Sequence, residues 1–147
     1  MFHIIDDQPY LCELLADIME TVGCEVKAFT SPQDYLNYVD SDLFIKPIAT
    51  LTDVDMPVIN GYEMMESILK TRPDMRFVVI SGEPGIRHEY KHLACMYLLK
   101  PFHPDIIETI VKKLKACALY GPDKEIDCIS CGDREAFVGS RWSCPQT

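Results

Sequence analysis

Residues 48–57 read IATLTDVDMP, an apolar run that ends in two acids, Asp53 and Asp55. The same arrangement occurs at residues 2–7, FHIIDD, where a shorter apolar run precedes an acid pair. Carboxylates crowded at the ends of buried segments must either find a cation or repel one another. The fold that brings these acids together therefore decides the chemistry of the chain.

The composition indicates a single globular domain without a basic surface. The chain has 147 residues, of which 48% are hydrophobic, and a formal net charge of −9. Affinity for nucleic acid rests on clustered Lys and Arg, so we expect no nucleic acid partner for this chain alone. A metal ion or a cationic partner fits the charge better.

Several features predict a cytoplasmic protein without a membrane partner. No apolar run approaches the ~20 residues that cross a bilayer, and Asp6 interrupts the N-terminus before a secretory segment could form. Four of the seven cysteines stand singly within predicted elements, as reduced thiols usually do. We expect the following cysteines to be small core residues: Cys12, Cys24, Cys95 and Cys117.

Short apolar runs alternate with longer segments of helical period. The apolar runs, read as strands, are residues 2–5, 25–29, 48–52, 77–80 and 97–99. The segments read as helices are residues 11–22, 32–39, 61–70, 86–94 and 104–119. This alternation predicts an α/β fold, with a doubly wound parallel sheet of five strands and helices on both faces.

Five polar side chains should meet at one edge of that sheet, because parallel strands present their carboxyl ends together. They are Asp6, Asp7, Asp53, Ser81 and Lys100. Gathered carboxylates and one ammonium suit Mg²⁺, which takes carboxylate and phosphate oxygens. With a hydroxyl donor, they are the parts for phosphoryl transfer to an Asp nucleophile. Singly, Asp6 or Asp7 could equally be a helix N-cap, and Lys100 a solvated loop residue.

The ordered set DD, D-x-x-M-P-x-x-x-G, S-G and K-P-F, over residues 2 to 120, resembles the receiver domain of bacterial two-component response regulators, including the chemotaxis regulators. The resemblance implies a flavodoxin-like sheet of order 2-1-3-4-5. It also implies a receiver domain over residues 1–120, a tail over residues 121–147, and phosphorylation of Asp53 by a sensor histidine kinase. The protein would be a signalling module that assists its own phosphorylation and dephosphorylation, not an enzyme.

The resemblance assigns roles to the site residues. Mg²⁺ would be bound directly by Asp7 and Asp53, mainly through water by Asp6, and through the backbone carbonyl of Asp55. Lys100 would contact the phosphoryl group, and its peptide bond to the following proline would be cis.

The resemblance also implies a switch. Ser81 would hydrogen-bond a phosphoryl oxygen, and Tyr97 would then turn inward. This movement would reshape the face built from residues 86–94, 97–99 and 104–119. The alternative for Tyr97 is an ordinary strand aromatic.

Two features depart from the family pattern. Ser81 and Lys100 are 19 positions apart, about three fewer than is usual in the family and close to one helical turn. The helix between them should be shortened, which puts the common dimer through this face in doubt. Asp55 and Glu83 occupy positions that tune dephosphorylation in the family, so we expect a neutral residue at position 83 to change that rate.

The tail holds CISCG and CPQT, which resemble the two knuckles of a zinc ribbon with Thr147 in place of the fourth Cys. A structural zinc site needs four ligands, and Cys128, Cys131 and Cys144 supply three. The sequence therefore leaves three alternatives for this segment: a zinc site, cysteines that form a disulfide or stay free thiols, or a mobile tail. The only Trp, Trp142, also lies here.

Two other functions are compatible with parts of the pattern. A phosphohydrolase could use DVD (residues 53–55) as nucleophile and acid, although such enzymes place this motif after the first strand. A degenerate receiver could serve only as a binding scaffold, but the complete set of acids, hydroxyl and Lys argues against it. The downstream protein partner is not indicated by the sequence.

Overall fold

The computed structural model describes residues 1–82 and 93–120. In chain order the elements are β1 (Phe2–Ile5), α1 (Pro9–Thr21), β2 (Val26–Phe29), α2 (Pro32–Val39), β3 (Thr50–Asp53), α3 (Gly61–Thr71), β4 (Phe77–Ser81), β5 (Met96–Leu99) and α4 (Asp105–Tyr120). The bounds agree with the predicted ones to within two residues at each end. The helix predicted over residues 86–94 falls largely outside the described residues.

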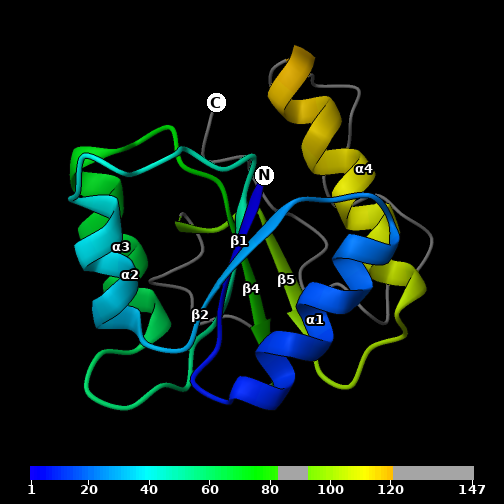
Figure 1. The fold of residues 1–147 in the computed structure, drawn as a ribbon, viewed down its shortest axis with the longest axis horizontal. Coiled ribbons are helices and arrows are strands. Elements are labelled where there is room, and N and C mark those ends of the chain that lie inside the picture. The colour runs from blue at the N-terminus through cyan, green and yellow to red at the C-terminus, as the bar shows by residue number, and fades with distance from the viewer. Residues whose placement is uncertain (83–92, 121–147) are drawn as a thin grey trace.

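The five strands form one parallel sheet of order β2-β1-β3-β4-β5, which confirms the predicted fold class and strand order. β3 lies at its centre, paired with β1 through Ile4 and Leu51 and with β4 through Asp53 and Ile80. Figure 1 shows α1 and α4 on one face of this sheet and α2 and α3 on the other. The carboxyl ends of all five strands therefore lie at one edge.

Each face of the sheet has its own hydrophobic core. Along β4, Val78 and Ile80 belong to the core beneath α1 and α4, whereas Phe77 and Val79 belong to the core beneath α2 and α3. Burial on both faces explains why this strand is an uninterrupted apolar run instead of an alternating one. None of the helices in the described part of the chain is long and apolar enough to span a membrane.

The predicted core cysteines are buried, and none forms a disulfide within the described residues: Cys12, Cys24, Cys95 and Cys117. The tail cysteines and Trp142 lie outside the residues that the structure describes.

A buried polar chain crosses the core beneath α2. His3 Nδ1 of β1 lies 2.9 Å from the Tyr35 hydroxyl, which lies 2.9 Å from Thr50 Oγ1 of β3. The His3 ring is fully buried and makes edge-on contacts with neighbouring rings, including those of Phe29 and Tyr38. These buried hydrogen bonds were not predicted from the sequence, because FHII reads simply as an apolar strand.

Candidate functional site

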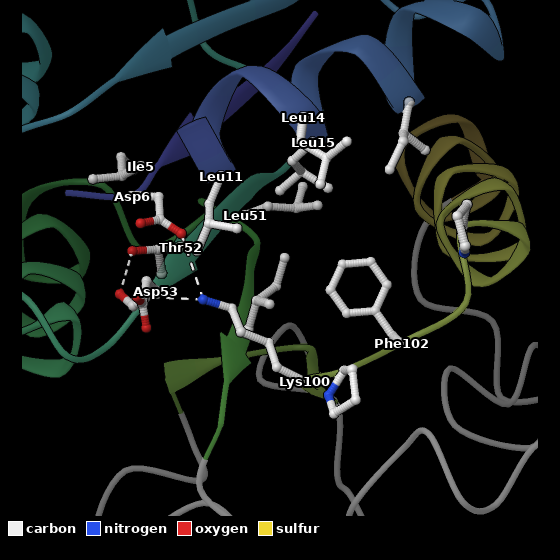
Figure 2. A pocket seen from close by; sticks show the side chains of 14 residues that line it. Ile5, Asp6, Leu11, Leu14, Leu15, Leu51, Thr52, Asp53, Lys100 and Phe102 are labelled. Carbon is white, nitrogen blue, oxygen red and sulfur yellow. Dashed lines mark hydrogen bonds and ion pairs between the residues drawn. The ribbon is translucent and has the colours of Figure 1, made fainter. Parts of the chain in front are cut away.

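Three charged side chains meet at the carboxyl-terminal edge of the sheet. Asp6 follows β1 directly, Asp53 is the last residue of β3, and Lys100 follows β5. Lys100 Nζ lies 3.5 Å from Asp6 Oδ2 and 3.5 Å from Asp53 Oδ2. Figure 2 shows the Lys100 side chain reaching across to both carboxylates. The ammonium is therefore shared between two acids that come from neighbouring strands.

Asp7 completes an acid cluster with Asp6 and Asp53. One carboxylate oxygen from each of the three lies within 4.8 Å of the others. Asp7 Oδ1 is buried, and it has no hydrogen-bond partner among the described residues. A buried carboxylate oxygen without a donor is costly unless a cation reaches it. This oxygen and its neighbours fit the hard oxygen ligands that Mg²⁺ prefers.

The pKa of Asp6 reflects its burial and its acidic neighbours. Burial raises the pKa of Asp6, and the charges of Asp53 and Asp7 raise it further. The backbone N–H of Gln8 and the ammonium of Lys100 oppose this rise without cancelling it. The pKa of Asp6 thus stays raised in spite of Lys100, and a divalent cation beside it would stabilise its ionised form.

The loop after β3 fixes the Asp53 carboxylate. Its Oδ1 accepts hydrogen bonds from the backbone N–H groups of Val54 (2.7 Å) and Asp55 (3.2 Å), which directs Oδ2 toward Lys100. Gly61, at the start of α3, donates its N–H to the Val54 carbonyl at 3.0 Å. A Cβ on Gly61 would clash with the Asp53 carbonyl oxygen and lie 2.9 Å from Val54 Cα. The glycine that closes the D-x-x-M-P-x-x-x-G motif is therefore required by this close approach.

The ends of β4 and β5 bring the remaining predicted residues to the same edge. Ser81, the last residue of β4, is fully buried, and its carbonyl accepts the Lys100 N–H at 2.7 Å. The Lys100–Pro101 peptide is cis, as the resemblance implies. Tyr97 of β5 is buried opposite Val79, in the core beneath α2 and α3.

The structure thus brings Asp6, Asp7, Asp53 and Lys100 into one cluster. Asp55 is exposed beside it and donates its N–H to Asp53. Glu83 and the tail residues Cys128, Cys131 and Cys144 lie outside the described residues, so their expected roles stay predictions.

An apolar cavity next to the cluster was not predicted. It has a volume of about 320 Å³, and it lies between α1 and the chain that leads from β5 into α4. Leu11, Leu14 and Phe102 line it, together with the Asp6, Asp53 and Lys100 side chains at one end. The helical spacing of the α1 leucines predicts a buried face, but spacing alone does not reveal a gap in the packing.

This geometry belongs to a known class of signalling module. Residues 2–112 match the sequence profile of the response regulator receiver domain, and the chain belongs to that family. Receiver domains are parts of two-component signalling, and they act as signalling modules instead of classical enzymes.

Among individual proteins, the chain is similar to the response regulator Rre1 of Synechocystis, with 29% identity over 122 residues. That match covers 77% of this chain and 50% of Rre1, so the chain spans about half the length of that relative. The chemotaxis protein CheY of Thermotoga maritima is 27% identical over 118 residues, which are 76% of this chain and 95% of CheY.

A solved structure shares the fold. The response regulator TrrA of Thermotoga maritima, determined in complex with Mg²⁺-BeF, superposes with a TM-score of 0.68 at 24% identity. The superposition covers 77% of this chain and 96% of TrrA.

Proposed function

We propose that this chain is a phospho-accepting response regulator, in which a sensor histidine kinase transfers a phosphoryl group to Asp53. The observation that carries the proposal is the shared position of Lys100, 3.5 Å from the carboxylates of both Asp6 and Asp53. A lysine held there can neutralise phosphoryl oxygens as they approach Asp53. The proposal includes a receiver domain over residues 1–120 and a separate tail over residues 121–147.

The proposed transfer is a substitution at phosphorus. Asp53 Oδ2 attacks the phosphoryl group, a bond from this oxygen to phosphorus forms, and the bond from phosphorus to the kinase imidazole nitrogen breaks. The electron pair of the broken bond stays on that nitrogen, and a proton taken from water by the other ring nitrogen lets the imidazole leave as a neutral ring. Because backbone N–H groups already hold Oδ1, Oδ2 is the oxygen assigned to attack.

Mg²⁺ would neutralise charge on the acids and the transferred phosphoryl oxygens. Asp7 Oδ1 supports this proposal because it is buried and lacks a hydrogen-bond donor among the described residues. Asp6, Asp53 and the backbone carbonyl of Asp55 are the other proposed ligands. TrrA, a response regulator of the same fold, was determined in complex with Mg²⁺-BeF, so Mg²⁺ binding by this fold is compatible with the proposal.

The proposed output is a two-state change at the edge formed by β4 and β5. A phosphoryl group on Asp53 would recruit the Ser81 hydroxyl, and the Tyr97 ring, which is already only 2% exposed, would turn further inward into the space that Ser81 leaves. Ser81 and Tyr97 are both buried, which supports a change between two distinct packing arrangements. Side chains in a close-packed interior have no room for a gradual movement.

Phosphorylation by a small donor tests the proposal. The protein is incubated with Mg²⁺ and acetyl phosphate, and its intact mass is measured. We expect one added phosphoryl group in the wild type and in Asp17→Asn, and none in Asp53→Asn. The Asp17 variant is the matched control, because it changes an exposed aspartate of α1 that lies outside the acid cluster.

The same experiment separates the alternatives. Steady release of phosphate from many unrelated esters would favour a phosphohydrolase that uses DVD (residues 53–55). An unmodified wild-type mass, both with acetyl phosphate and with a phosphorylated histidine kinase, would favour a degenerate receiver that serves as a binding scaffold.

A further inference from the structure

The residue before the acceptor is a threonine in an otherwise apolar row of the sheet. Thr52 is 1% exposed, and its partners in the neighbouring strands are Ile5 and Val79, which belong to the core beneath α2 and α3. Valine would fit this row with almost the same shape, because it branches at Cβ as threonine does. A hydroxyl buried in such a row is unfavourable unless it makes a hydrogen bond. Packing therefore accounts for the shape of Thr52 and leaves its hydroxyl to be explained.

The Thr52 hydroxyl donates to the carbonyl of the acceptor residue. The distance from Thr52 Oγ1 to the Asp53 carbonyl oxygen is 2.8 Å, and Figure 2 shows the two residues side by side. Gly61 approaches the same oxygen so closely that a Cβ on it would clash. The Asp53 carbonyl is therefore held by a hydrogen bond and by a close backbone contact.

One peptide group connects this carbonyl with the Asp53 side chain. The Asp53 carbonyl and the Val54 N–H belong to the same planar trans peptide, so they point in opposite directions. The Val54 N–H donates to Asp53 Oδ1 at 2.7 Å, and Asp53 Oδ2 lies 3.5 Å from Lys100 Nζ. A hydroxyl that fixes the carbonyl thus fixes the direction of the N–H that holds the carboxylate.

We propose that Thr52 is a positioning residue for phosphorylation: its hydroxyl orients the peptide group after Asp53 and so aims Asp53 Oδ2 at the incoming phosphoryl group. Thr52 acts through the backbone and does not touch the phosphoryl group. A nucleophile that is already held in the direction of attack reacts faster, because less freedom is lost on the way to the transition state. This inference rests on the phosphorylation proposed for Asp53.

Thr50 supplies a matched control on the same strand. It lies two positions earlier on the same face of β3, it is fully buried, and its hydroxyl lies 2.9 Å from that of Tyr35 within the core. Thr50→Val and Thr52→Val therefore remove equivalent buried hydroxyls, of which only the second is bonded to the acceptor residue. Thr52→Ser keeps the hydroxyl, and Thr52→Ala removes it together with the methyl group.

The initial rate of labelling by acetyl phosphate and Mg²⁺, followed by intact mass, tests this role. We expect Thr52→Val and Thr52→Ala to be labelled about five- to tenfold more slowly than the wild type, and Thr52→Ser and Thr50→Val to stay within about twofold of it. Amide hydrogen exchange of Val54, measured by NMR, should be at least about fivefold faster in Thr52→Val than in Thr50→Val, because only the first change releases its peptide group. Urea unfolding of each variant checks that it is folded.

The outcomes separate positioning from packing and from the reaction itself. Labelling of Thr52→Val at the wild-type rate would overturn the inference. Slow labelling of Thr52→Ser would assign the effect to the lost methyl group, and slow labelling of Thr50→Val would assign it to the loss of any buried hydroxyl, so either result also refutes it. Unchanged exchange of Val54 in Thr52→Val would refute the proposed orientation of the peptide group without reference to phosphorylation. An unlabelled wild type would instead contradict the phosphorylation of Asp53, and with it the role of Thr52 in that reaction.

Discussion

Acid should destabilise this protein through His3, and His3→Gln should remove much of that sensitivity. The His3 ring is fully buried, its Nδ1 contacts the Tyr35 hydroxyl, and its Nε2 has no partner among the described residues. Burial, together with the smaller effects of the Lys27 and N-terminal charges, lowers the pKa of His3 from 6.5 to about 4. The folded state therefore keeps this ring neutral at pH values at which the unfolded chain protonates it.

The sign and size of the effect follow from linkage. Because the folded pKa lies below the unfolded one, the contribution of His3 is fully present above about pH 6.5 and is lost as the pH falls toward 4. Between pH 7 and pH 5 the two pKa values give a loss of about 2 kcal/mol in the free energy of unfolding. Asp6 acts in the opposite direction, since its raised pKa adds stability as the pH falls. The difference between wild type and variant isolates the histidine.

Urea unfolding at pH 7 and pH 5, followed by circular dichroism, measures this difference. Gln has a similar size and can still bond the Tyr35 hydroxyl, but it does not titrate, so His3→Gln should lose about 2 kcal/mol less than the wild type over this interval. Tyr35→Phe is the control. It removes the hydroxyl bonded to His3 Nδ1, so it should lower stability at both pH values and leave the pH dependence in place. Parallel pH profiles for wild type and His3→Gln would refute the buried neutral histidine.

Two further predictions concern the loop that holds Asp53. Gly61→Ala should destabilise the fold by about 2 kcal/mol or more in urea unfolding, because its Cβ would meet the backbone around Asp53. Gly82→Ala is the control and should be near neutral, because the space around that Cβ is open. Similar losses of stability in the two variants would contradict this account. Val58 has φ 72° and is fully exposed, so Val58→Asn should raise stability by about 1 kcal/mol. An unchanged urea midpoint for Val58→Asn would show that its backbone is not strained.

The acid cluster could be predicted because it depends only on the order of elements. Once strands and helices alternate, every residue that ends a strand falls on one edge of a parallel sheet. Asp53 and Lys100, 47 positions apart, are therefore brought to the same edge, and the long Lys100 side chain reaches past the end of β4 to Asp53. The same reasoning brings Asp6 to this edge, and the structure agrees.

Features that depend on packing could not be predicted in this way. The partner of His3 is Tyr35, 32 positions away on α2, and the alternation of strands and helices does not indicate which hydroxyl reaches the ring. The cavity beside Leu14 exists because the side chains of α1 and the Phe102 ring, on the same face of the sheet, do not fill the space between them. Hydrophobic periodicity identifies the face that is buried, but it does not determine how completely that face is filled.

The charge imbalance at the site connects stability with function. Burial and the neighbouring acids raise the pKa of Asp6, so the folded state favours the neutral form of this side chain more than the unfolded chain does. A cation that binds only the folded cluster stabilises it, and at ten times its dissociation constant the gain is about 1.4 kcal/mol. Removing one of the acids would relieve the repulsion and weaken cation binding at the same time. The acids whose mutual repulsion disfavours the cluster are therefore the same groups that would give it affinity for a divalent ion.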